Sequence, residues 1–212
     1  MSDGSRPYRS ALRDEQSRTT RRRIVDAGGE LFVTHGYVPT TIDAIAERAG
    51  VSRRTVFTSV GGKAVVLKLA FDWTLAGDDE PVAIGDRPEV RHMMDGEDPA
   101  ELLTAWMAMN ATINRRLAPL HHVLVVAADA DPDAAALLAT THDQRIDGAQ
   151  GVIARLAALG GLQPGLDPNQ AAAIADVLID PTLYGRLIDL RGWSFTTYVE
   201  HLQRIAAASL LG

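Results

Sequence analysis

The chain contains no cysteine, few aromatic residues and no long hydrophobic run. The absence of cysteine excludes disulfides, thiol nucleophiles and cysteine-based metal sites. No stretch approaches the roughly 18 consecutive apolar residues of a membrane-spanning helix, and the N-terminal segment lacks the apolar centre of a signal peptide. We therefore expect a cytoplasmic protein without a membrane partner. A hydrophobic share of 46% with only 5% aromatic residues favours small-residue packing between helices.

Acidic charge predominates, with a net charge of −6 over 212 residues, but it is unevenly placed. Residues 1–76 hold 12 Lys and Arg against 8 Asp and Glu, whereas residues 77–212 hold 9 against 19. A basic front joined to an acidic back is expected when only one end of a protein meets phosphate. Chance scatter of charges is the alternative explanation.

Helical spacing recurs along the chain and no useful stretch alternates apolar and polar residues, so we expect an all-α protein. Asp-Pro pairs predict helix starts, because aspartate accepts hydrogen bonds from first-turn amides and proline fits the first helical position. Plain turns also use this pair. The four pairs are Asp98-Pro99, Asp131-Pro132, Asp167-Pro168 and Asp180-Pro181. Pro119 is a candidate for a fifth start.

Composition also divides the chain. Residues 1–16 are polar and rich in Arg and Ser, and we expect them to form a flexible arm. Residues 77–98 combine Gly, Pro and acidic residues without a sustained period, which predicts a connecting loop containing at most one short turn. The loop separates residues 17–76, the basic part, from residues 99–212.

Three residues within 17–76 have the spacing of a helix-turn-helix. The motif needs a small residue in its first helix, a glycine at the turn and an aliphatic anchor on the second helix. Ala46, Gly50 and Val56 supply them. We expect the motif's core to comprise Ile45, Ala46, Gly50, Val56 and Phe57. A helical hairpin in an unrelated α protein produces the same spacing by chance.

The segment from Arg21 to Asp72 resembles the TetR family of bacterial repressors along its whole length. The shared features are the Ile24–Phe32 helix, Gly36-Tyr37, Thr40-Thr41-Ile42, Ile45-Ala46 through Gly50-Val51-Ser52, Thr55-Val56 and Lys63. Asp180–Tyr184 and Arg191–Ser194 look like the C-terminal domain of an actinobacterial subgroup. Phe57 and Val60 depart from the family pattern, which has Tyr at the first position and commonly an aromatic at the second. Without a tyrosine hydroxyl at Phe57, one phosphate hydrogen bond worth about 1 kcal/mol is lost.

The resemblance assigns DNA contacts to particular residues. Base reading falls to the first turns of the recognition helix, where an arginine can hold guanine O6 and N7. The base-reading candidates are Arg53, Arg54, Thr55 and Thr58. Backbone amides and hydroxyls just before a helix can donate hydrogen bonds to a phosphate. The resemblance adds a lysine that binds phosphate in this family. The phosphate candidates are Thr40, Thr41, Ser59 and Lys63. The alternative for the two arginines is that they face solvent or contact phosphate only. The alternative for Thr41 is that it only caps a helix.

For residues 99–212 the resemblance implies an effector-binding and dimerisation domain. The candidate pocket residues are Trp106, Met109, Asn110, His121, His122, Thr141, His142 and Arg145. An ordinary core is the alternative for each. Two long helices within Asn169–Arg191 and Ser194–Leu211 are expected to pair with a second copy. Their alanines, Ala171–Ala173, Ala175 and Ala206–Ala208, permit close approach, unless they pack inside the monomer.

The resulting hypothesis is a homodimeric, sequence-specific DNA-binding repressor that an unidentified small molecule releases from a palindromic operator. We expect no enzymatic activity, because no P-loop, nucleophile elbow or metal-binding motif is present. We accordingly predict no cofactor and no metal. An activator, or a DNA-binding regulator or DNA-organising protein without an effector, is the alternative.

Overall fold

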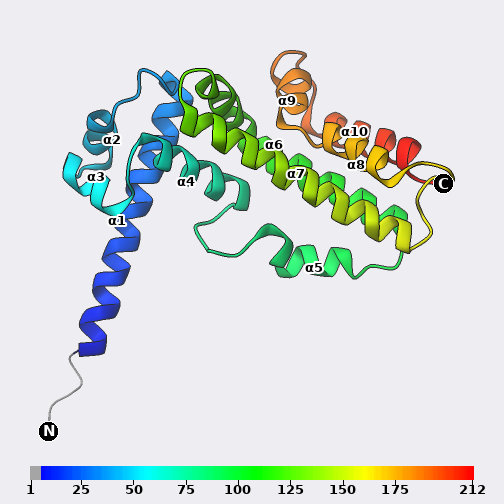
Figure 1. The fold of residues 1–212 in the computed structure, drawn as a ribbon, viewed down its shortest axis with the longest axis horizontal. Helices are drawn as coiled ribbons and strands as arrows, with labels where there is room; N and C mark the ends of the chain where they lie inside the picture. Colours follow the sequence, from blue (N-terminus) through cyan, green and yellow to red (C-terminus); the bar gives the residue numbers. More distant parts are fainter. Residues whose placement is uncertain (1–5) are drawn as a thin grey trace, which may run out of the picture.

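A computed structural model describes residues 6–212, and all its regular elements are helical, which confirms the all-α prediction (Figure 1). One isolated antiparallel bridge joins Leu162 and Leu211. The elements are α1 (Arg6–His35), α2 (Ile42–Ala49), α3 (Arg53–Ser59), α4 (Lys63–Ala76), η1 (Ile84–Asp86), α5 (Pro88–Met94), α6 (Pro99–Ala128), α7 (Pro132–Ala158), α8 (Pro168–Leu178), α9 (Pro181–Tyr184), η2 (Gly185–Asp189) and α10 (Phe195–Leu210). None of the described helices combines the length and apolarity that a bilayer crossing requires.

The N-terminal segment differs from the prediction of a flexible arm over residues 1–16. Helix α1 begins at Arg6, so residues 6–16 extend the first helix of the chain; residues 1–5 lie outside the described range. Pro7 stands in the first turn, where its missing N–H costs no hydrogen bond. From there to His35 no second proline interrupts the helix.

All four Asp-Pro pairs begin helices as predicted. Asp98 accepts hydrogen bonds from the amides of Ala100 and Glu101, and the other three aspartates cap α7, α8 and α9 in the same way. Pro119 begins no helix, because it lies inside α6. A proline there costs roughly 3 kcal/mol, and the burial of α6 side chains on both sides of it offsets this cost.

One other predicted segment differs from the structure. The segment 77–98 contains the single turn η1 and also the helix α5, which starts at Pro88. The stretch Asn169–Arg191 is divided at Asp180-Pro181 as predicted: α8 ends at Leu178, and the short α9 continues into the π-helical turn η2. In both places proline marks the start of a new element.

The buried apolar side chains form two clusters. The first lies among α1 to α4 and includes Phe32, Ile45, Val56 and Leu67, which are almost completely buried, together with side chains from α6 and α7. The second joins α6 to α7, α8 and α10. Helix α6 contributes to both clusters, whereas α4 contacts α1 on one side and α6 on the other.

Helices α1 and α4 approach each other closely at Gly28. A Cβ atom built on this glycine overlaps Cγ1 of Val66, so only glycine fits without a shift of the backbone or of Val66. Gly29, the next residue, has room for a methyl group, since its nearest neighbour is the Cβ of Ala70 at 3.4 Å.

Candidate DNA-binding surface and ligand cavity

The turn between α2 and α3 is held by backbone and cap hydrogen bonds. Thr41 caps α2, because its hydroxyl accepts a hydrogen bond from the amide of Ala44 at 3.1 Å. Gly50 ends α2 in the left-handed conformation at φ 66°, which favours glycine. Ser52 caps α3 by accepting from the amide of Thr55 at 3.0 Å. These bonds present the first turn of α3 to solvent.

The core of the helix-turn-helix contains Ile45, Ala46 and Val56, each at most 5% exposed. Phe57 was expected in this core, and this prediction is wrong. Its side chain is 47% exposed and lies under the guanidinium of Arg53, with 5.6 Å between the guanidinium carbon and the ring centroid. Val56 already occupies the inward position, so the next residue along the helix points outward.

The candidate base-reading side chains occupy two different environments. Arg53 and Arg54 are exposed; Arg53 donates to Asp43 at 2.6 Å, whereas Arg54 has no ion pair among the described residues. The Thr55 hydroxyl is hydrogen-bonded with Ser52 at 2.8 Å, and Thr58 donates to the carbonyl of Arg54 at 3.0 Å. The two arginines are therefore the longest groups that this face offers to a base edge.

The four phosphate candidates are also divided. Thr41 is exposed, and Ser59 is half-buried at the end of α3. Thr40 does not suit this role, because it is 4% exposed and its hydroxyl donates to the carbonyl of Gly36 at 2.7 Å. The ammonium of Lys63 donates to the carbonyl of Tyr37 at 3.1 Å and lies 4.1 Å from that residue's ring centroid. The ammonium keeps one further N–H, because the two carbonyls of Tyr37 and Val38 engage two of its three donors.

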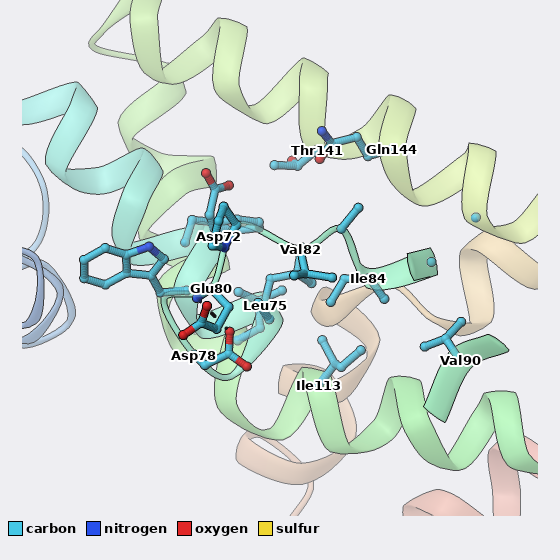
Figure 2. A pocket seen from close by; sticks show the side chains of 18 of the residues that line it. Asp72, Leu75, Asp78, Glu80, Val82, Ile84, Val90, Ile113, Thr141 and Gln144 are labelled. Atoms are coloured by element: carbon cyan, nitrogen blue, oxygen red, sulfur yellow. Dashed lines mark hydrogen bonds between the residues drawn. The ribbon is translucent and has the colours of Figure 1, made fainter. Parts of the chain in front are cut away.

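A large cavity of about 1260 Å³ lies between α4, α6, α7 and the segment from Asp78 to Gly85. Figure 2 shows Val82 and Ile84 of this segment between Ile113 on α6 and the α7 pair Thr141 and Gln144. Most lining side chains are apolar. Cavities of this size and composition suit small organic ligands.

Six of the eight predicted pocket residues line this cavity: Trp106, Met109, Asn110, His121, Thr141 and Arg145. His122 and His142 do not, and both are exposed. On a helix, successive residues point about 100° apart, so each of these histidines faces away from its lining neighbour. Their inclusion in the predicted pocket was wrong.

Arg145 is the cationic side chain of α7 in the cavity wall. Its guanidinium lies 2.6 Å from Asp176 Oδ1 and 2.9 Å from Asp180 Oδ2. Burial alone raises the pKa of Asp180, but hydrogen bonds from Thr182 and the nearby charge of Arg145 outweigh it and hold the pKa below its usual range. One guanidinium thus faces two carboxylates.

His121 is buried beside this group of charges. Burial lowers the pKa of its imidazole, and the nearby Arg145 lowers it further, while Asp180 acts in the opposite direction. Nε2 of His121 is buried without a hydrogen-bond partner among the described residues. The imidazole is therefore uncharged at neutral pH.

The lowered pKa of His121 predicts that stability falls in mild acid. Below about pH 6.5 the unfolded chain protonates this histidine, whereas the folded chain does so only at lower pH. The free energy of unfolding therefore decreases as pH falls through that window. We expect the melting temperature to drop between pH 7 and pH 5, and His121→Phe to reduce the drop. His122→Phe, which changes an exposed histidine, should leave the drop unchanged.

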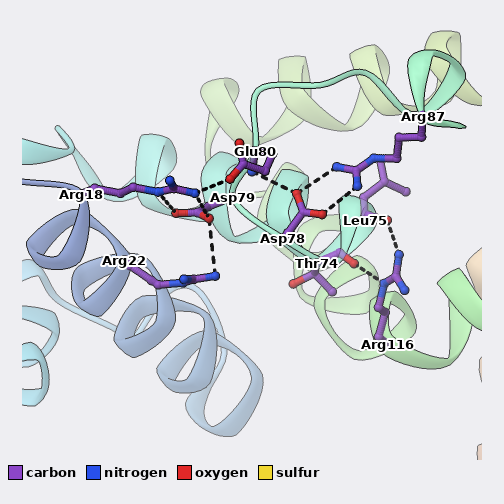
Figure 3. Close-up of polar contacts among 9 residues, drawn as sticks. All are labelled: Arg18, Arg22, Thr74, Leu75, Asp78, Asp79, Glu80, Arg87 and Arg116. Atoms are coloured by element: carbon purple, nitrogen blue, oxygen red, sulfur yellow. Dashed lines mark hydrogen bonds and ion pairs between the residues drawn. The ribbon is translucent and has the colours of Figure 1, made fainter. Parts of the chain in front are cut away.

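The segment between α4 and α5 is tied to α1 by ion pairs, as Figure 3 shows. Arg18 donates to Asp79 at 2.8 Å and to Glu80 at 2.6 Å, and Arg22 lies 3.4 Å from Asp79. The hydrogen bond from Arg18 holds the pKa of Asp79 below its usual range. We call the group Arg18, Arg22, Asp79 and Glu80 the clasp.

Two further arginines fix the ends of the same segment (Figure 3). Arg87 pairs with Asp78 at 2.7 Å and lowers the pKa of that carboxyl to about 2. Arg116 on α6 donates to the carbonyls of Thr74 at 2.6 Å and Leu75 at 2.7 Å, at the end of α4. Sequence reasoning missed these contacts. The only sign of these contacts in the sequence is the acidic run Asp78-Asp79-Glu80, which does not indicate the arginines that pair with it.

The C-terminal alanines divide between interior and surface. Four of them are buried in the second cluster of the same chain: Ala171, Ala172, Ala175 and Ala206. For these four the alternative of packing inside the monomer holds. Val177 and Leu190 are instead exposed, at 64% and 75%. Ala173 and Ala208 are exposed too, so the apolar surface in this region combines two of the predicted alanines with larger side chains.

Sequence comparison with known proteins matches only part of this chain. The family model described as bacterial regulatory proteins, tetR family, matches residues 24–68. The HTH-type transcriptional regulator TtgW of Pseudomonas putida is 36% identical over 75 residues, which are 35% of this chain and 53% of TtgW. This chain thus spans about half or less of the length of the curated relatives that it matches.

Solved structures show the same fold over almost the whole chain. NalD from Pseudomonas aeruginosa, described as the secondary repressor of the MexAB-OprM multidrug efflux pump, aligns with a TM-score of 0.70 and 22% identity. The alignment covers 92% of this chain and 98% of NalD. A transcriptional regulator from Saccharomonospora viridis, solved with choline, gives 0.70 at 19% identity and covers 91% and 97%.

Proposed function

Because this chain belongs, through residues 24–68, to the TetR family of bacterial regulatory proteins, we propose that it is a dimeric, sequence-specific DNA-binding repressor that a small molecule releases from its operator. The observation that carries the proposal is the first turn of α3, where a capped helix start exposes Arg53 and Arg54. A helix end of this kind enters the major groove in helix-turn-helix proteins.

The proposal is tested by selecting bound sequences from a pool of random duplex DNA. We expect a near-palindrome whose half-sites lie about one helical turn, roughly 34 Å, apart. Binding should weaken steeply with salt, because phosphate contacts release counterions. Enrichment of no sequence above the starting pool contradicts sequence-specific binding, and a single unrepeated half-site contradicts the two-fold arrangement.

Release by a small molecule is supported by the position of the cavity beside α4. The cavity touches Phe71 and Leu75 on α4, and α4 packs against α1 at the DNA-binding end. The segment that closes the cavity also carries Asp79, a member of the clasp. A ligand that moves this segment therefore acts on α1 as well as on α4. This arrangement favours an effector over the alternative of a regulator without one.

The clasp carries a prediction for DNA binding. The double variant Asp79→Asn/Glu80→Gln removes the carboxylates that Arg18 and Arg22 contact in the clasp. We expect severalfold tighter binding to random duplex DNA at low salt, and a salt slope steeper by about 0.9 for each additional phosphate contact. The matched control, Asp86→Asn/Glu89→Gln, removes the same charge from exposed positions outside the clasp. Equal effects of the two variants would attribute the change to net charge alone.

Dimerisation is proposed to use the exposed apolar surface around α8 and α10. Val177 is 64% exposed and follows the half-buried Ile174 on α8. A second copy that buries this surface gains roughly 25 cal/mol for each Å² of apolar area. Val177→Asp should therefore convert the dimer to a monomer in sedimentation measurements. Val33→Asp changes an equally apolar, exposed residue on α1 and should not. If Val177→Asp loses helical content, the milder variant Val177→Ser is tested in its place.

A further inference from the structure

The polar side chains of Asn110, Asn114 and Thr141 on the inner wall of the cavity are uncharged, and each already donates one hydrogen bond within the protein. Nδ2 of Asn110 donates to the carbonyl of Trp106, and Nδ2 of Asn114 donates to that of Ile179, both at 2.9 Å. The hydroxyl of Thr141 donates to the carbonyl of Leu138 at 2.8 Å. Each group keeps acceptor oxygens, and each asparagine amide keeps one more N–H, but none of the three carries the positive charge that would compensate an anion. Gln144 adds an uncharged amide at the exposed edge (Figure 2).

Arg145 does not supply the missing positive charge. Asp176 and Asp180 both hold its guanidinium within 3 Å. A carboxylate ligand would have to displace one of them and leave that side chain partly buried without its partner. Losing a buried charge partner is costly. The inner wall is therefore a poor site for an anion.

His121 is the polar group of this wall that lacks a partner. The residue lines the cavity, is 4% exposed, and leaves Nε2 buried without a hydrogen bond among the described residues. Buried polar atoms in folded proteins usually have partners. Burial keeps this imidazole uncharged, and the same burial penalises a positive charge on any group placed beside it. A neutral ligand group suits the site.

Resting on the proposed function, we propose that the cavity takes an uncharged, largely apolar molecule that bears a hydroxyl group, with His121 as its polar anchor. A hydroxyl both donates and accepts, so it pairs with either tautomer of His121. The apolar part then lies along the apolar lining, which includes Trp106, Met109 and Ile113.

The outer end of the cavity has a different character. There Arg18 and Arg21 lie among the carboxylates of Asp72, Asp79 and Glu80. Arg18 is already paired in the clasp and Asp72 with Lys68. This end is in contact with solvent, where charges interact weakly. The inner wall therefore determines the class of ligand.

The test compares three probes that share one chain length: 1-decanol, decanoate and decylammonium, each titrated into the full-length protein at neutral pH. Trp73 and Trp106 line the cavity, so their fluorescence reports occupancy. We expect 1-decanol to bind at least about tenfold more tightly than either ion, the ratio for about 1.4 kcal/mol. In His121→Phe its affinity should fall about fivefold or more, while His122→Phe should bind it as the wild type does.

Equal or tighter binding of decanoate or decylammonium to the wild type overturns the inference, and this comparison does not depend on the folding of a variant. An unchanged affinity of folded His121→Phe for 1-decanol overturns the role of His121. The same preparation is assayed with selected DNA. Failure of all three probes with DNA binding intact rejects the ligand class alone. Binding of 1-decanol without any DNA selection rejects the proposed function and leaves the cavity's preference standing.

Discussion

Replacing Arg54 with alanine is expected to weaken binding to the selected operator by roughly 1–3 kcal/mol, about 5- to 150-fold. Arg54 is exposed in the first turn of α3 and has no ion pair among the described residues, so no internal partner has to be broken before it reaches a base. The variant should also relax the preference at one base pair of each half-site. Competition binding with operators changed at single positions measures both effects.

Two arginine variants serve as references for this experiment. Arg53→Ala removes a side chain that already pairs with Asp43 at 2.6 Å, so part of its gain on DNA is offset by the lost pair and we expect a smaller effect. Arg48→Ala removes an exposed arginine on α2 that pairs with Glu30. It should lower affinity evenly across sequences. If Arg54→Ala also did so, with a shallower salt slope, Arg54 would contact phosphate only.

Gly28→Ala is expected to destabilise the DNA-binding end by roughly 1–3 kcal/mol, the usual cost of overpacking. The added methyl group overlaps Val66, so α1 and α4 must move apart. Since α1 also packs on α2 and α3, the shift should reach the recognition helix as well. Thermal unfolding and operator affinity are measured together, and both should fall.

Gly29→Ala provides a matched control, because it makes the same chemical change one residue further along α1. The nearest atom to its new methyl group is the Cβ of Ala70 at 3.4 Å, which is ordinary contact. Replacing a helical glycine with alanine stabilises by roughly 0.5–1 kcal/mol where space allows. The two variants should therefore shift the melting temperature in opposite directions. A shift in the same direction would mean that helix propensity, not the α1–α4 contact, decides the outcome.

Features that depend on a few neighbouring residues were predictable from the sequence. The capping aspartates before the prolines at 99, 132, 168 and 181 act within three residues of themselves, and the same holds for Ser52 and Gly50 at the helix-turn-helix. Pro119 shows the limit of such local rules. It has the residue type of a helix start, but packing along α6 outweighs the lost hydrogen bond.

Features that depend on distant residues were not predictable. Thr40 and Phe57 exchanged their expected environments, because burial at each position is decided by how α1 and α3 pack. Six of the predicted residues, all on α6 and α7, line the cavity, but its third wall, the segment carrying Val82 and Ile84, has no helical period to indicate it. The clasp joins residues that are 61 positions apart, and no local pattern connects them.

The contribution of α6 to both apolar clusters has a thermodynamic consequence. Leu117, Leu120 and Leu124 complete the cluster that α1 to α4 begin, while Leu103 and Met107 of the same helix belong to the other. Unfolding of either cluster removes packing from a helix that the other cluster also needs. The chain should therefore unfold in one cooperative transition, with matching calorimetric and van't Hoff enthalpies. A fragment ending at residue 76 would expose the apolar side of α4 and should be only marginally stable.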